Sequence, residues 1–223
     1  ANIGGAGGEG GSYYESKVHT QDLLISARYG IFQVVGDTAG PAAMMAGFRS
    51  IPIYLNICRE MEKCCPNAIL INHANPMAIL CRAMNKYTNL RSIIGICHGV
   101  QAGIEYIARI LETPPQELNV TWIGTNHYYW FTKIYHKGKN IYPELRKRTL
   151  SLEPDKDKIL STKLSQIYGY QITYPEDDHI IEFYPFLAQV KDGAHLPYNL
   201  AQSHHGKNVT EMYACLLYTS PSP

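Results

Sequence analysis

Ser92-Ile-Ile-Gly-Ile-Cys-His-Gly99 is the stretch that decides the fold, because a short apolar run that ends in polar residues is typical of a buried parallel strand. A similar run, Ala68-Ile-Leu-Ile-Asn72, precedes it and ends shortly before Asn75-Pro76. Segments with apolar residues at helical spacing follow both runs, and another such segment precedes them. Helix, strand, helix, strand, helix is the order of a doubly wound α/β sheet.

Three predicted helices surround these two strands. The first begins near Gly40-Pro41 and ends before Pro66, and Pro52 either kinks it or marks its true start. Pro114-Pro115 ends the third helix. The expected buried faces are Phe48, Ile51, Leu55 and Cys58 in the first helix, Met77, Leu80, Cys81 and Met84 in the second, and Val100, Ile104, Ile107 and Leu111 in the third.

The pattern changes after Gln116. Residues 119–124 and 127–135 are predicted strands, and residues 142–150 and 156–168 are predicted helices. We therefore expect an α/β chain in which residues 1–115 form the carboxyl-side part of a Rossmann-like, doubly wound parallel sheet. Residues 116–214 would form an α+β domain over the mouth of that sheet.

Both ends of the chain have unusual sequences. Only three residues precede the Gly-rich stretch 4–11, too few for the strand that a phosphate-binding loop needs, so we interpret this stretch as a flexible loop. Residues 215–223 resemble the translation of a sequencing adapter, and we expect them to be foreign to the fold. On this interpretation the chain is a fragment cut at both ends.

Composition and charge narrow the choice of partners. A net charge of +1 gives no electrostatic reason to expect nucleic acid or an acidic membrane. The apolar runs are too short to span a bilayer and no secretory signal opens the chain, so we expect a cytoplasmic protein. The six cysteines do not form a disulfide framework, because Cys58 and Cys81 fall in helical stretches and adjacent Cys64 and Cys65 cannot easily bridge each other.

Polar residues follow both predicted strands, at the edge where an open parallel sheet binds its ligands. Asn75 could offer its amide to a cofactor or a sugar hydroxyl, or could simply cap the helix that Pro76 starts. Cys97 and His98 suit a metal or a nucleophile, but a Cys-His pair alone is a weak signal.

A second metal ligand would have to come from elsewhere in the chain, and His127 is the best candidate. It closes the polar cluster Gly124-Thr-Asn-His127 at the end of a predicted strand. A thiolate together with an imidazole suits Mn, Fe, Co, Ni or Zn. A hydrogen-bonded structural histidine is the alternative interpretation.

Taken as an ordered set, the motifs of this chain resemble glycoside hydrolase family 4. They are Gly36-Asp-Thr-Ala-Gly-Pro41, Arg49-Ser-Ile-Pro52, Asn75-Pro-Met-Ala78, Gly95-Ile-Cys-His98, Asn126-His127 and His179-Ile-Ile-Glu-Phe-Tyr-Pro185. A Cys followed by His is similar to the α-galactosidase-like and uronidase-like branches. The resemblance covers residues 1 to 200, roughly, and the family's dinucleotide fingerprint would lie in a missing amino-terminal part.

The resemblance implies a glycosidase that depends on NAD and on Mn(II) or another divalent transition metal. It also implies that residues 1–115 belong to the NAD-binding domain and residues 116–214 to the metal and substrate domain. In this family NAD takes a hydride from C3 of the sugar, a base removes the acidified proton on C2, and the leaving group departs from C1. Water addition and reduction of the ketone then complete hydrolysis. The residues that the family pattern assigns are the metal ligands Cys97 and His127, the substrate-binding Asn75, Asn126 and His179, and the cofactor-binding Asn75 and Pro76.

The resemblance also suggests the residues that transfer protons. His98 stands where relatives carry a candidate general acid, with substrate binding as its alternative role. Several relatives use a tyrosine base in the segment Glu182-Phe-Tyr184, which makes Tyr184 the candidate here, although Phe183 occupies the corresponding place. His179, Asp178 and a metal-bound hydroxide are the rival bases.

Under this hypothesis the substrate is a small-molecule α-galactoside, or a related α-glycoside or uronide, and the enzyme is a homo-oligomer as in many family members. One alternative is an NAD-dependent 2-hydroxy acid dehydrogenase of the same superfamily, which shares Asn-Pro after a strand but needs no metal. Others are a non-catalytic zinc or sugar-binding module and a fragment without activity of its own.

Overall fold

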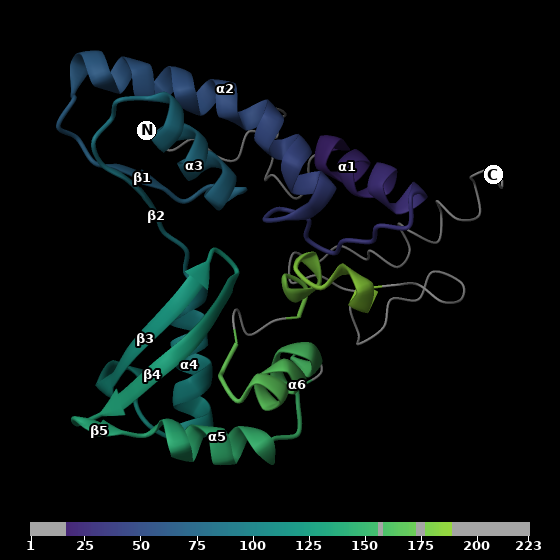
Figure 1. Cartoon of the computed structure of the whole chain (residues 1–223), viewed down its shortest axis with the longest axis vertical. Helices are drawn as coiled ribbons and strands as arrows, with labels where there is room; N and C mark the ends of the chain where they lie inside the picture. Colours follow the sequence, from purple (N-terminus) through teal and green to yellow (C-terminus); the bar gives the residue numbers. More distant parts are fainter. Residues whose placement is uncertain (1–16, 156–157, 173–176, 189–223) are drawn as a thin grey trace.

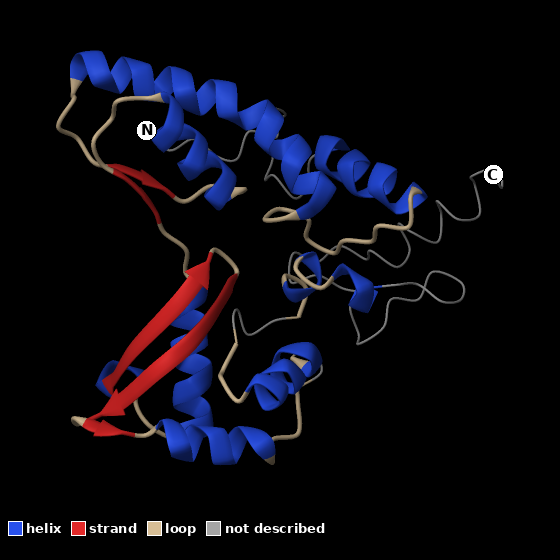
Figure 2. Cartoon of the chain, viewed as in Figure 1, coloured by secondary structure: helices blue, strands red, loops and turns tan. Residues whose placement is uncertain are grey.

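The computed structural model describes residues 17–155, 158–172 and 177–188 of the chain. The Gly-rich opening and the expected foreign tail lie outside these residues. The described part is a mixed α/β structure with a two-stranded parallel sheet and a three-stranded antiparallel sheet (Figures 1 and 2).

Helix α2, Gly40–Cys64, is the longest described element, and Pro52 lies inside it rather than at its start. Its buried face consists of Ala42, Ala43, Ala46, Gly47, Ser50, Tyr54 and Cys58. The predicted face was therefore wrong about Phe48, whose side chain is 64% exposed. Small residues form this face because α1, Lys17–Arg28, and α3, Met77–Tyr87, pack closely on α2. A Cβ atom at Gly47 would lie 3.0 Å from the Ile79 side chain.

The parallel sheet pairs β1, Leu70–Asn72, with β2, Ile93–Gly95, and Leu70 lies opposite Ile93. One face of this sheet packs on α2 and α3, where Tyr54, Cys58, Leu80, Met84 and Leu90 form a core. The other face is open among the described residues, so the expectation of fully buried strands was wrong for Ile71, which is 61% exposed. The alternation of strands and helices is confirmed, whereas helices on both faces of this sheet stay a prediction.

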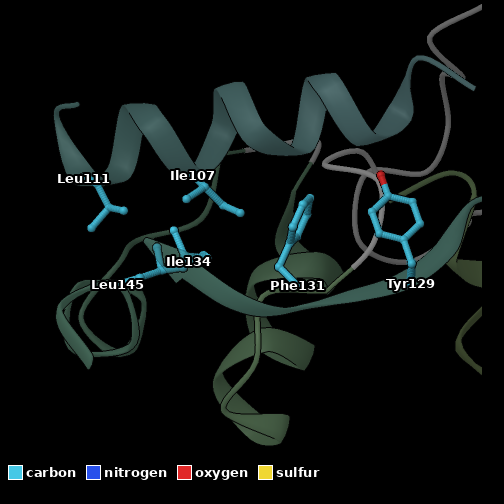
Figure 3. Close-up of a cluster of buried hydrophobic side chains, with 6 residues drawn as sticks. All are labelled: Ile107, Leu111, Tyr129, Phe131, Ile134 and Leu145. Atoms are coloured by element: carbon cyan, nitrogen blue, oxygen red, sulfur yellow. The ribbon is translucent and has the colours of Figure 1, made fainter. Parts of the chain in front are cut away.

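A second core lies between α4, Gly99–Leu111, and an antiparallel hairpin (Figure 3). The hairpin consists of β3, Leu118–Thr125, and β4, Tyr128–His136, and the short β5, Lys139–Asn140, extends the sheet. The buried residues of this second core are Ile107, Leu111, Tyr129, Phe131, Ile134 and Leu145. The predicted stripe of α4 is confirmed at Ile107 and Leu111. The expected domain boundary at residue 116 stays a prediction, and α4 packs with the elements that follow this boundary.

Two more helices complete the carboxyl-side elements. Helix α5, Tyr142–Leu150, has the predicted bounds, and α6, Ile159–Tyr168, occupies most of the predicted range 156–168. Three short 3-10 turns are also described: Pro115–Glu117 precedes the hairpin, and Ile180–Glu182 and Pro185–Ala188 follow α6. Asp177 accepts hydrogen bonds from the backbone N–H groups of Leu160 and Ser161, at 2.7 and 2.8 Å, and so caps α6 from outside the helix.

None of the helices in the described segments has both the length and the apolarity that crossing a membrane requires. The five cysteines in the same segments are all free thiols, as predicted, and they are Cys58, Cys64, Cys65, Cys81 and Cys97.

Candidate active site

Four segments that are distant in sequence bring polar side chains to one place. Asp37 and Thr38 come from the loop that leads into α2, and Asn75 follows β1. Asn126 and His127 form the turn between β3 and β4, and His179 immediately precedes the 3-10 turn Ile180–Glu182. Cys97 follows β2, so Asn75 and Cys97 lie at the carboxyl edge of the parallel sheet. This is the edge at which open parallel sheets bind ligands.

A chain of hydrogen bonds connects the amides at this edge to a buried carboxylate. The Asn126 side-chain amide donates to Asn75 Oδ1 at 2.9 Å, and Asn75 Nδ2 donates to Asp37 Oδ2 at 2.6 Å. The Thr38 hydroxyl donates to the other oxygen, Oδ1, at 2.7 Å. Asp37 is fully buried, and these donors replace the water that its charge would otherwise require.

The same hydroxyl fixes the orientation of His127. Thr38 Oγ1 lies 2.6 Å from His127 Nδ1. Because the single Thr38 proton goes to Asp37, the hydroxyl must accept a hydrogen bond, which makes Nδ1 of His127 the donor. The remaining ring nitrogen, Nε2, is then the one that can offer a lone pair to a metal when the imidazole is neutral.

His127 also occupies an unusual backbone conformation, with φ at +60°. A residue other than glycine in this left-handed region costs free energy, and such residues concentrate at functional sites. The His127 side chain is buried, and its ring centroid is 3.9 Å from that of His179. Both imidazoles have Nδ1 at 3.7 Å from Asp37 Oδ1.

Electrostatic interactions couple His127 to a carboxylate and a thiol. Burial alone would lower the pKa of His127, but interactions with Asp37 and Cys97 outweigh it and raise this pKa to about 10. For Cys97, burial raises the pKa, yet the interaction with His127 outweighs it and leaves the pKa below its usual value. The pair therefore favours a thiolate beside an imidazolium, and a cation that replaced the proton would meet a thiolate and a neutral imidazole.

The donor set fits a divalent metal ion. Asp37, His127 and His179 are all buried and each offers one ligand atom within 4.8 Å of the others. Two imidazoles and one carboxylate are a ligand set that suits first-row transition metals with open coordination positions. Cys97 borders this cluster through its interaction with His127.

Glu182 connects the cluster to the start of α2. Its Oε2 atom accepts hydrogen bonds from the backbone N–H groups of Thr38 and Ala39, both at 2.8 Å. Its Oε1 atom lies 3.4 Å from His179 Nδ1. Complete burial raises the pKa of Glu182, although the neighbouring His179 opposes this. Sequence reasoning quoted Asp37 and Glu182 within motifs but gave neither a role; polar residues directly before a helix start were the available signal for Asp37.

The structure places the other predicted site residues outside this cluster. His98 is exposed at the start of α4 and lies edge-on to His73, with ring centroids 6.4 Å apart. Pro76 is buried, and it is within 4 Å of where a Cβ atom at Gly47 of α2 would lie. Asp178, a rival base, is buried next to His179. The roles of these residues stay predictions.

Tyr184 belongs to a group of aromatic rings beside the cluster. Its hydroxyl lies 2.6 Å from that of Tyr128 and 2.9 Å from that of Tyr168, and Phe183 stacks on Tyr128 at 4.5 Å. Burial, followed by the two neighbouring hydroxyls, raises the pKa of Tyr184 far above its usual value. A phenol in this environment holds its proton strongly, which disfavours Tyr184 as the base in this arrangement.

Comparison with known proteins identifies the family of this chain. The model of a family described as "Family 4 glycosyl hydrolase" matches residues 9–113. The chain is 32% identical over 166 residues to an α-galactosidase of Bacillus subtilis, covering 74% of this chain and 38% of that protein. It is 30% identical to an α-galacturonidase of Thermoanaerobacter italicus, covering 59% of this chain and 29% of that protein. The chain thus spans less than two fifths of the length of these relatives.

Solved structures share the fold. The crystal structure of lplD from Bacillus subtilis has a TM-score of 0.67 at 23% identity, with 90% of this chain and 52% of that chain covered. A 6-phospho-α-glucosidase from gut microorganisms, solved in complex with NAD and Mn²⁺, has a TM-score of 0.62 at 22% identity, with 73% and 42% covered. The chain belongs to glycoside hydrolase family 4.

Proposed function

We propose that the protein of which this chain is part hydrolyses an α-glycoside, an α-galactoside or an α-linked uronide, with NAD and a divalent metal such as Mn(II). The observation that carries the proposal is the buried cluster of Asp37, His127 and His179, with Cys97 and Asn75 at the carboxyl edge of the parallel sheet. Relatives named α-galactosidase and α-galacturonidase support the two substrate classes.

Each residue of the cluster contributes a defined property. His127 and Cys97 would hold the metal, with Asp37 and His179 close enough to complete its ligands. The bound metal would supply Lewis-acid stabilisation of negative charge on the sugar oxygens, and NAD would supply reversible hydride transfer. Thr38 holds the His127 ring in one tautomer, and burial of the cluster excludes water from it.

The two amides would orient the substrate. Asn126 and Asn75 are hydrogen-bonded to each other and then to Asp37, so their positions are fixed before any ligand arrives. One hydrogen on each side-chain nitrogen can still bind a sugar hydroxyl or the cofactor, because each amide has two donors. Such pre-organisation lowers the entropy cost of positioning a sugar ring.

The test uses the complete gene product in reducing buffer. We expect hydrolysis of 4-nitrophenyl α-galactoside or of the corresponding α-galacturonide only when NAD and Mn(II) are both present, and loss of hydrolysis in Cys97→Ala. Cys81→Ala, a half-buried cysteine of α3, serves as the control that keeps activity. Hydrolysis that ignores NAD and metal would refute the proposal. NADH formation from 2-hydroxy acids without any hydrolysis would assign the protein to the dehydrogenases instead.

A further inference from the structure

The outer face of the hairpin, turned away from α4, carries a row of aromatic side chains that starts at the candidate active site. Tyr128 directly follows His127 in β4, and its ring is 4.6 Å from that of Trp130. The Trp130 ring in turn lies 6.4 Å from Tyr168 at the end of α6. The Tyr168 hydroxyl lies 2.9 Å from the Tyr184 hydroxyl, which in turn lies 2.6 Å from the Tyr128 hydroxyl. The rings therefore form one continuous surface next to the cluster.

Two hollows on this face share Thr132 and Tyr170. The first, of about 270 Å³, lies between Ile123, Trp130, Tyr168 and Tyr170. The second, of about 500 Å³, extends it towards α5. Exposed aromatic surface in a hollow is characteristic of ligand-binding grooves, and flat rings suit the apolar faces of sugar rings.

The far end of this groove is basic. Arg146 and Lys147 of α5 line the second hollow, and both side chains are exposed. The polar groups beside them are the Asn140 amide and the Tyr142 hydroxyl, and the described lining residues include no carboxylate. Two cations without a lining carboxylate attract an anion, and an uncharged ligand lacks this attraction and binds less tightly.

We propose that this groove binds the leaving-group part of an acidic oligosaccharide, a chain of linked uronic acids, while the terminal sugar occupies the candidate active site. The inference rests on the proposed function for the position of the terminal sugar. Trp130, Tyr168 and Tyr170 provide stacking surfaces for successive rings, and Arg146 and Lys147 pair with their carboxylates. The groove is thereby selective for uronides over neutral galactosides.

The test measures binding without turnover, so that it stands apart from the activity assay. The chain has two tryptophans, and Trp122→Phe leaves Trp130 as the single fluorescent reporter. We expect trigalacturonate to change the Trp130 emission saturably in the absence of NAD and metal. The neutral tetrasaccharide stachyose should give no saturable change at the same concentrations.

Further substitutions in the Trp122→Phe protein test whether the ligand binds in this groove. Arg146→Ala and Tyr170→Ala should each weaken trigalacturonate binding roughly fivefold, and added salt should weaken it in the parent but much less in Arg146→Ala. Arg59→Ala removes one exposed positive charge from α2 and should leave trigalacturonate binding unchanged. No saturable response, equal binding of stachyose, or equal loss in Arg59→Ala would overturn the proposal. So would a dimer, seen by sedimentation, that Tyr170→Ala dissociates, because a second copy would then occupy the face. Loss of hydrolysis with this binding intact would refute only the proposed function.

Discussion

Glu182 shows how much of this site depends on a single side chain. Its carboxylate accepts two backbone hydrogen bonds at the start of α2 and lies beside His179. The residues that it joins are 144 and 143 positions away in sequence. The helix start and the candidate metal ligands therefore depend on the same contact.

Replacing Glu182 tests this dependence. Glu182→Ala leaves the N–H groups of Thr38 and Ala39 buried without an acceptor, which should reduce the free energy of unfolding by about 2–4 kcal/mol. Glu182→Gln keeps one acceptor oxygen, so its free energy of unfolding should fall by less than that of Glu182→Ala. Urea unfolding measures both, with Glu105→Ala on the exposed side of α4 as a control of little effect. An alanine variant as stable as the parent would contradict the anchoring role.

Cobalt substitution can show whether Cys97 binds the metal or only borders a site formed by other residues. If Cys97 binds the metal, the Co(II)-loaded protein should show thiolate-to-cobalt charge-transfer absorption in the near ultraviolet, and Cys97→Ser should abolish it. Cys64 and Cys65 are adjacent in sequence and exposed, and together they could bind Co(II) themselves, so both are first changed to serine. Cobalt binding without this absorption would instead assign the ion to Asp37, His127 and His179.

The sequence could predict part of this site. Asn75, Cys97 and His127 each follow a strand and are recognisable from that position, and the motif order pointed to His179. The contributions of Asp37, Thr38 and Glu182 could not be predicted, because they depend on segments that meet only after folding. His98 adjoins Cys97 in sequence, yet the beginning of α4 leaves its side chain exposed.

At the scale of elements, short hydrogen bonds and close packing hold the carboxyl-side helices to the hairpin. The Tyr142 hydroxyl at the start of α5 donates to the Phe131 carbonyl at 2.7 Å and accepts from the Gln171 N–H at 2.8 Å. It thereby ties α5, β4 and the segment after α6 together. On the opposite face of β4, a Cβ atom at Gly103 of α4 would lie 2.8 Å from the Phe131 ring, so only glycine permits this approach.

Tyr142 should make stability depend on pH at the alkaline end. Burial is the main cause that raises the pKa of Tyr142, from 10.0 to about 12. The folded state keeps a proton that the unfolded state loses, so this contribution is complete below pH 10 and disappears as the pH approaches 12. Tyr142→Phe should cost about 1–3 kcal/mol at neutral pH, because two backbone groups lose their partner.

The comparison of parent and Tyr142→Phe isolates this effect from the other tyrosines. Their difference in unfolding free energy should shrink between pH 10 and 12. Tyr29→Phe, at a ring that is 80% exposed, is the control whose difference from the parent stays small throughout. A constant difference across this pH range would contradict the assignment.

Element bounds were predictable where periodicity and proline signals agree, as in α5 and α4. The buried face of α2 could not be predicted in this way. Its small residues give only a weak hydrophobic signal, whereas Phe48, which is exposed, gives a strong one. Close packing against α1 and α3 selects small side chains there, and this tertiary requirement outweighs the preference for burying an aromatic ring.

At the scale of the whole molecule, the candidate ligands come from the loop before α2, the hairpin turn and the segment after α6 (Figure 1). An ion bound to all three would join the amino-side helices to the hairpin. Binding to the folded state alone then stabilises the entire described chain.

Mn(II) should therefore raise the melting temperature of the chain. At a free concentration one hundred times the dissociation constant, the expected stabilisation is about 2.7 kcal/mol, and a chelator should reverse it. Replacing His179 with alanine should remove most of the increase, whereas Arg59→Ala on α2 should retain it. An increase that survives in His179→Ala, Asp37→Asn and His127→Ala alike would show that the ion binds elsewhere.

The order of the three ligands along the chain also governs when the site can form during synthesis. Asp37 leaves the ribosome well before His127, and His179 follows last. At 5 to 20 residues per second, roughly 7 to 28 s separate the first ligand from the third. Through this interval the nascent chain presents an incomplete set of donors, which binds stray cations less tightly than the finished cluster. A metal ion can therefore meet the complete set of candidate ligands only after His179 has been made, and the tightest binding is reserved for chains that have reached at least this length.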